Sequence, residues 1–128
     1  MNKAILCVDD EVVILLSLVM ELKSMFGPKY MYERATSAEE ALSIIDELDH
    51  EHIEVILIIS DWLMPEIKGD EFLDIVKNKY PNIKSIIITG QADMKAVENL
   101  NSNPSVKAVL KKPWDEKQLK QIITGICN

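Results

Sequence analysis

Short apolar runs alternate along this 128-residue chain with longer stretches whose apolar residues recur at helical spacing. Two of the runs, Ile5-Leu6-Cys7-Val8 and Val55-Ile56-Leu57-Ile58-Ile59, are continuously apolar, which is typical of strands covered on both faces of a sheet. Alternation of such strands with amphipathic helices is typical of parallel α/β sheets. We therefore predict one domain over residues 1–128, a doubly wound five-stranded parallel sheet flanked by five helices.

The bounds of the predicted elements follow from where each pattern begins and ends. The strands are predicted at residues 3–8, 30–35, 53–60, 84–89 and 106–111. The helices are predicted at residues 11–26, 37–48, 72–80, 92–100 and 115–126. Ser37 and Glu40 have the spacing of a capping box, and Pro81 ends the third helix.

The first predicted helix is more apolar than one core-facing stripe requires. The stripe that faces the sheet would consist of Val12, Leu15 or Leu16, Val19, Leu22 and Phe26. A second face at helical spacing would then consist of Ile14, Leu18 and Met25. This second face is either an extension of the core or a docking surface, and the pattern favours neither.

Charge and composition exclude several classes of function. The formal net charge of -7 argues against nucleic-acid binding, which depends on clustered Lys and Arg. Five apolar residues separate Lys3 from Asp9, too few for a secretory signal, and no run approaches the ~20 apolar residues of a membrane span. The two cysteines match neither a disulfide framework nor a metal motif. We expect a cytoplasmic protein that binds no membrane.

Carboxylates directly follow two of the predicted strands. Asp9 and Asp10 follow the first strand, and Asp61 follows the third. Ligands of open parallel sheets bind at the carboxyl ends of the strands, so these acids would meet where chemistry is expected. Like charges repel unless a divalent cation shares them, which indicates an Mg²⁺ site. The plainer alternative is a solvated strand end or a helix cap.

Two further polar side chains follow the fourth and fifth predicted strands. The hydroxyl of Thr89 and the ammonium of Lys112 could both contact phosphoryl oxygens, while Asp61 could attack phosphorus and form an aspartyl phosphate. Alternatively, Thr89 is an ordinary β-branched strand residue and Lys112 an exposed surface charge. The coincidence of all these groups at strand ends favours phosphoryl chemistry.

Four short segments resemble the signature segments of response-regulator receiver domains of bacterial two-component signalling. They are Val8-Asp9-Asp10-Glu11, Ser60-Asp61-Trp62-Leu63-Met64-Pro65 with Gly69, Ile88-Thr89-Gly90 and Lys111-Lys112-Pro113-Trp114. The segments occur in the order of the family and span essentially the whole chain. The resemblance, closest in kind to chemotaxis regulators, implies a flavodoxin-like sheet with strand order 2-1-3-4-5.

The resemblance also implies the roles of the residues near the acids. Asp61 would be the phospho-acceptor, and it would hold Mg²⁺ together with Asp9, Asp10 and the backbone carbonyl of Leu63. Leu63 and Gln91 occupy the positions that tune hydrolysis of the aspartyl phosphate in this family, because they decide how water is aligned. An apolar Leu63 cannot orient water, so we expect a comparatively long-lived phosphoryl group.

By the same resemblance, Thr89 would be the switch hydroxyl and Lys112 the phosphoryl contact, with a cis bond between Lys112 and Pro113. Gly90 would leave room for the incoming donor. Val109 departs from the family, where this position is often an aromatic residue coupled to the threonine. We therefore expect a conformational change that is smaller or carried by other side chains.

Partners follow from the resemblance as well. The donor would be a sensor histidine kinase or a phosphotransfer protein, whose helices would meet the face formed by Ile14, Leu18 and Met25. The signal would leave toward a downstream effector domain or protein, or toward a second copy in a homodimer. The residues predicted for this output face are Met94, Val97, Val109 and Lys111.

Three classes of function are compatible with such a fold. The leading one is a receiver, which phosphorylates and slowly dephosphorylates itself and is therefore not an enzyme with a turnover substrate. The alternative is an Mg²⁺-dependent aspartyl-phosphate phosphatase of the haloacid dehalogenase type, but such enzymes have Asp-x-Asp after the first strand and a cap domain. A flavin or nucleotide module would need a Gly-rich loop that is missing after the first strand.

Overall fold

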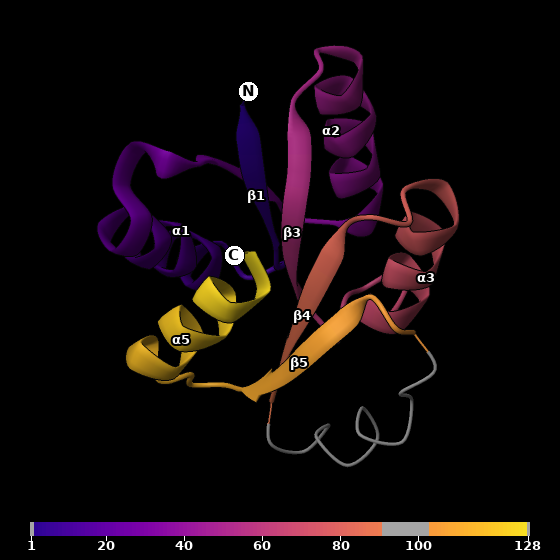
Figure 1. Cartoon of the computed structure of the whole chain (residues 1–128). Coiled ribbons are helices and arrows are strands. Elements are labelled where there is room, and N and C mark those ends of the chain that lie inside the picture. Colours follow the sequence, from indigo (N-terminus) through magenta and orange to yellow (C-terminus); the bar gives the residue numbers. More distant parts are fainter. Residues whose placement is uncertain (1, 91–102, 128) are drawn as a thin grey trace.

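Five parallel strands form one sheet in the order β2-β1-β3-β4-β5 in the computed structural model, which describes residues 2–90 and 103–127 (Figure 1). The strands are β1 (Lys3–Val8), β2 (Met31–Ala35), β3 (Glu54–Asp61), β4 (Lys84–Thr89) and β5 (Val106–Lys111). The helices are α1 (Val12–Phe26), the short 3-10 helix η1 (Gly27–Lys29), α2 (Ala38–His50), α3 (Gly69–Lys79) and α5 (Glu116–Cys127). The predicted sheet and its strand order are confirmed.

The helices cover both faces of the sheet, as expected for a doubly wound domain. Helices α1 and α5 lie on one face, and α2 and α3 lie on the other (Figure 1). The predicted helix at residues 92–100 lies outside the described residues, and so do the predicted site residues Gln91, Met94 and Val97. In the part of the chain that the structure describes, no helix is both long and apolar enough to cross a membrane.

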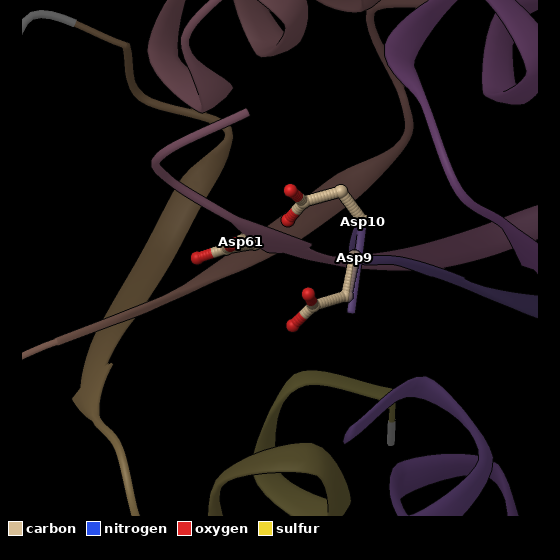
Figure 2. Close-up of side chains that lie close together, drawn as sticks. All are labelled: Asp9, Asp10 and Asp61. Atoms are coloured by element: carbon tan, nitrogen blue, oxygen red, sulfur yellow. The ribbon is translucent and has the colours of Figure 1, made fainter. Parts of the chain in front are cut away.

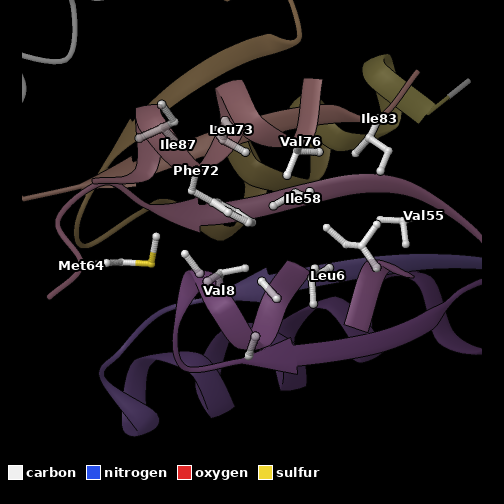
Figure 3. Close-up of a cluster of buried hydrophobic side chains, with 14 of the residues drawn as sticks. Leu6, Val8, Val55, Ile58, Met64, Phe72, Leu73, Val76, Ile83 and Ile87 are labelled. Atoms are coloured by element: carbon white, nitrogen blue, oxygen red, sulfur yellow. The ribbon is translucent and has the colours of Figure 1, made fainter. Parts of the chain in front are cut away.

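Two cores separate the layers, because side chains alternate along each strand. Leu6, Val8 and Ile58 pack against Phe72 and other residues of the core beneath α2 and α3 (Figure 3). The intervening residues of the same strands pack beneath α1 and α5. Each fully buried aliphatic or aromatic side chain stabilises the fold by ~1.5–3 kcal/mol relative to an exposed one. The central strands are thus held on both faces, and so are their carboxyl ends.

Helix α2 begins at the predicted cap. The Ser37 hydroxyl accepts a hydrogen bond from the backbone N–H of Glu40 at 3.1 Å, and the Glu40 carboxylate accepts one from the backbone N–H of Thr36 at 2.8 Å. The return bond therefore reaches the residue before the cap rather than the cap itself. These bonds satisfy two N–H groups that lack partners within the helix.

The structure corrects the predicted faces of α1. The prediction that Leu18 lies on an outer face is wrong, because Leu18 is only 2% exposed. The residues that pack on the sheet follow the i, i+3, i+4, i+7 spacing of one helix face and are Leu15, Leu18, Val19 and Leu22. Ile14 and Met25 are half-buried. The exposed apolar residues are instead Val12, Val13, Leu16 and Met20.

Candidate functional site

Three aspartates meet at the carboxyl edge of the sheet, where two neighbouring strands end. Val8 pairs with Ser60 in the β1–β3 register, so Asp9 and Asp61 follow at the same level. One carboxylate oxygen from each of Asp9, Asp10 and Asp61 lies within 4.8 Å of the others (Figure 2). Asp9 and Asp61 are 3% and 6% exposed, whereas Asp10 is exposed. The predicted convergence of the three acids is confirmed.

Lys112 joins this cluster from the end of β5. Its Nζ lies 3.0 Å from Oδ2 of Asp9 and 3.3 Å from Oδ1 of Asp61. Its backbone N–H donates to the carbonyl of Thr89 at 2.7 Å, and the bond to Pro113 is cis, as expected. Burial lowers the pKa of Lys112, but the interactions with Asp9 and Asp61 raise the pKa by more than burial lowers it. The pKa of Lys112 therefore lies above its ordinary value. The side chain is therefore a lasting positive charge within the acidic cluster.

The surroundings of Asp61 raise the pKa of its carboxyl group. Burial raises its pKa, the neighbouring charge of Asp9 raises it further, and Lys112 opposes both, which leaves the pKa at about 6. At pH 7 roughly nine tenths of the molecules still carry the carboxylate form. Asp61 is thus mostly ionised at neutral pH, although its surroundings penalise the charge.

The cluster could hold a hard divalent cation. Three carboxylates face one ammonium, so the site keeps an excess of negative charge. Carboxylate oxygens are the ligands that Mg²⁺ and Ca²⁺ prefer, and a cation shared between the acids would remove their mutual repulsion. The chemistry of the donor set therefore fits the predicted metal.

An open pocket of about 530 Å³ lies over the cluster. Its lining residues come from four strand ends and the loops that follow them, and they are Asp10, Glu11, Asp61, Leu63, Met64, Pro65, Gly90 and Lys112. The Leu63 side chain is 54% exposed at this pocket, and Gly90 adds no side chain to it. The volume is in the range of pockets that hold small ligands.

Thr89 and Val109 are not among the residues that line this pocket. Thr89 is fully buried, and its hydroxyl donates to the carbonyl of Gly90 at 3.4 Å. Val109 is half-buried and packs against the core beneath α2 and α3. The Thr89 hydroxyl thus lies at the end of β4, the strand next to β3, and donates to a backbone carbonyl.

Gly69, which the sequence analysis includes in the second signature segment without a role, is a part of the site. A Cβ atom at this position would lie 2.5 Å from the carbonyl oxygen of Asp61 and 2.8 Å from the Cα of Trp62. The backbone N–H of Gly69 donates to the Trp62 carbonyl at 2.6 Å, and the Trp62 indole donates to Asp70 at 3.1 Å. These contacts hold the start of α3 against the acceptor strand, and no local sequence signal gives this approach.

Glu11 is a second residue without a predicted role. Its backbone N–H donates to Oδ1 of Asp9 at 2.9 Å, and its carboxylate lies 3.9 Å from Nζ of Lys112. Because it directly follows Asp9 and Asp10, its place at the pocket rim could have been read from the sequence.

A doubly wound parallel sheet with an acidic pocket at its strand ends is typical of α/β proteins that act on ligands at that edge. Within this class, the family described as "Response regulator receiver domain" matches residues 5–124 of the chain. The chain belongs to this family, as its four signature segments indicated.

Relatives and solved structures agree with this assignment. The chain is 34% identical over 118 residues to the sensor kinase CckA of Brucella abortus, covering 92% of this chain but 12% of that protein. It is 31% identical over 125 residues to a probable chemotaxis protein CheY of Rhizobium etli, covering 95% and 90%. A response regulator receiver domain from Clostridium thermocellum matches with a TM-score of 0.82 at 28% identity, covering 98% and 94%. A CheY-like receiver protein from Methanospirillum hungatei matches with a TM-score of 0.76 at 29% identity, covering 98% and 93%.

Proposed function

We propose that this receiver takes a phosphoryl group on Asp61 from a phosphohistidine of a sensor histidine kinase or a phosphotransfer protein. The observation that carries the proposal is the contact of Asp61 with Lys112 inside an acidic cluster that can bind a cation. This arrangement supplies an ionised oxygen as nucleophile and positive charge for the phosphoryl oxygens. Positioning and charge are what phosphoryl transfer asks of a protein.

The transfer is balanced without any further reactant. A carboxylate oxygen of Asp61 attacks phosphorus, a P–O bond forms, and the P–N bond to the donor histidine breaks, so that the imidazole leaves and takes up a proton. Asp9, Asp10, Asp61 and the carbonyl of Leu63 would hold Mg²⁺, which would supply charge neutralisation for the phosphoryl group. Lys112 would pair with one phosphoryl oxygen.

The switch that follows rests on Thr89. Its hydroxyl contacts a backbone carbonyl at 3.4 Å, which is long for an O–H···O bond, so exchanging this partner costs little. A phosphoryl oxygen on Asp61 is a charged and therefore stronger acceptor. Rotation of Thr89 toward Asp61 is the first step by which we propose that phosphorylation alters the output face.

The proposed surface for the donor is the exposed apolar side of α1. It consists of Val13, Leu16 and Met20, which start three residues after Asp10 and replace Leu18 in this role. Lys111, exposed on β5, and the half-buried Val109 are the described members of the proposed output face toward an effector or a second copy. We place this signalling in the cytoplasm, where the two free cysteines would stay reduced.

The same chemistry argues for a signalling module without a turnover substrate. Asp61 is phosphorylated once per signal. The aspartyl phosphate then hydrolyses slowly, since the apolar Leu63 at the pocket has no group to orient water. A phosphatase of the haloacid dehalogenase type stays the alternative, but the family match argues against it.

One experiment separates the two functions. The protein is incubated with Mg²⁺ and acetyl phosphate or beryllofluoride, and intact mass is measured beside an Asp61→Asn variant. A stoichiometric adduct on the wild type that is absent from the variant supports the receiver function. Steady release of phosphate from small phosphoesters, with no adduct on Asp61, would support the phosphatase and refute the proposal.

A further inference from the structure

One side-chain hydrogen bond ties the segment after Lys112 to helix α1. The indole Nε1 of Trp114 donates to Oε1 of Glu21 at 3.1 Å, and the two residues are 93 positions apart in the chain. The other carboxylate oxygen of Glu21 accepts from the Ser17 hydroxyl at 3.4 Å, which orients the acceptor. Trp114 is half-buried and packs against the core beneath α1 and α5. The proposed phosphotransfer assigns no role to Glu21 or Trp114.

This bond and one backbone hydrogen bond restrict the chain on both sides of Lys112. On one side the backbone N–H of Lys112 is held by the Thr89 carbonyl at 2.7 Å. On the other side Pro113, whose ring fixes its φ angle, leaves few free torsions between Lys112 and Trp114. A displacement of Trp114 is therefore expected to move the backbone of Lys112 as well.

The position of Lys112 leaves little tolerance for such a displacement. Its Nζ lies 3.0 Å from Asp9 and 3.3 Å from Asp61, close to the upper limit of a direct polar contact for the second. A shift of about 1 Å would break the contact with Asp61, and misplacements of that size lower reaction rates strongly.

We infer that Glu21 and Trp114 are positioning residues, which hold the Lys112 ammonium where it contacts Asp61 and the arriving phosphoryl group. The inference rests on the proposed function of Asp61 and adds a determinant of its rate. Neither side chain contacts the three carboxylates, so both act through Lys112.

Glu21 also lines the surface groove on α1 that contains Val13, Leu16 and Met20, near Glu116 at the start of α5. Glu21, which we infer to position Lys112, is thus accessible from the proposed donor surface. A structural role within α1 alone would not require the bond of this carboxylate to the indole of Trp114.

The test uses five variants of the whole chain, four single variants and the double variant Glu21→Met with Trp114→Phe, and follows the rate of adduct formation on Asp61 with Mg²⁺ and acetyl phosphate. Glu21→Met removes the acceptor and keeps the side-chain length, and Trp114→Phe removes the donor and keeps an aromatic ring. Glu21→Gln keeps an acceptor oxygen. Glu47→Met removes an exposed charge from α2 as the matched control. Urea unfolding followed by circular dichroism checks that each variant is folded.

The expected rates follow from the loss of one hydrogen bond. Glu21→Met and Trp114→Phe should each slow the reaction about three- to tenfold, which corresponds to one net hydrogen bond. The double variant should be no slower than the slower single variant, because both changes remove the same interaction. Glu21→Gln should stay within about twofold of the wild type, and Glu47→Met should not differ from it.

Three results would overturn the inference: unchanged rates in both single variants, additive effects in the double variant, or a Glu21→Gln rate as low as that of Glu21→Met. Each of these requires that the wild type forms the adduct on Asp61. A wild type that forms no adduct instead refutes the proposed function, and the inference falls with it, so the two failures are distinguishable.

Discussion

Replacing Asp61 by Asn should stabilise the metal-free protein at neutral pH. Burial and the charge of Asp9 raise the pKa of Asp61 from its ordinary 3.8 to about 6. The folded state therefore binds the proton more tightly than the unfolded state, and the free energy of unfolding falls as pH rises through this interval. Each pKa unit corresponds to ~1.4 kcal/mol, so the ionised side chain costs the folded state ~3 kcal/mol at pH 7. The uncharged Asn avoids this cost.

The measurement is urea unfolding followed by circular dichroism, in EDTA, at several pH values from 4 to 7.5. The two proteins should be about equally stable near pH 4, and Asp61→Asn should gain ~2–3 kcal/mol over the wild type by pH 7. Asp49→Asn makes the same chemical change at an exposed carboxylate on α2 and should stay within ~0.5 kcal/mol of the wild type.

Magnesium provides a second arm of this experiment. Mg²⁺ binds the folded wild type and stabilises it by mass action, so the difference from Asp61→Asn should shrink as its concentration rises. A difference that does not change with pH would contradict the reasoning from burial and repulsion. So would a wild type that is the more stable protein at pH 7 in EDTA.

Four further substitutions test other parts of the site. Lys112→Met should lower the free energy of unfolding in EDTA by ~2 kcal/mol, and Mg²⁺ should recover most of this; an unchanged melting temperature would count against the ion pairs. Gly69→Ala should cost ~1–3 kcal/mol, because its Cβ would clash with backbone atoms, and urea unfolding at wild-type stability would contradict the close approach. Leu63→Asn should speed loss of the phosphoryl group from Asp61, measured by mass over time, whereas an unchanged rate would exclude water alignment at this position. Met20→Glu should slow transfer from a histidine kinase but not from acetyl phosphate, and equal slowing of both would exclude docking on α1.

The sheet could be predicted because its signal is local. Continuous apolar runs such as Val55 to Ile59 mark strands covered on both faces, and alternation with amphipathic stretches implies parallel pairing. The start of α2 at Ser37 could also be predicted, since a cap depends on a few neighbouring residues. Helix α1 was harder: with apolar residues on most sides, its sequence does not distinguish Leu18, which is buried, from Leu16, which is exposed.

The contacts of the site also differ in whether the sequence predicts them. Asp9, Asp61 and Lys112 could be predicted to meet, because strand ends of a parallel sheet converge on one edge. The bond between Glu21 and Trp114 could not, since it depends on how the segment before α5 packs against α1. Contacts of this kind arise only from the relative placement of packed elements.

The positions of the two tryptophans provide an intrinsic fluorescence signal for the site. Trp62 directly follows Asp61, Trp114 lies two residues after Lys112, and the sequence contains no other tryptophan. All tryptophan fluorescence of this chain therefore comes from residues that are close in sequence to Asp61 or Lys112, and no attached dye is needed. Substituting either indole by Phe would leave a single emitter, so events on the β3 side and on the β5 side could be recorded separately in real time.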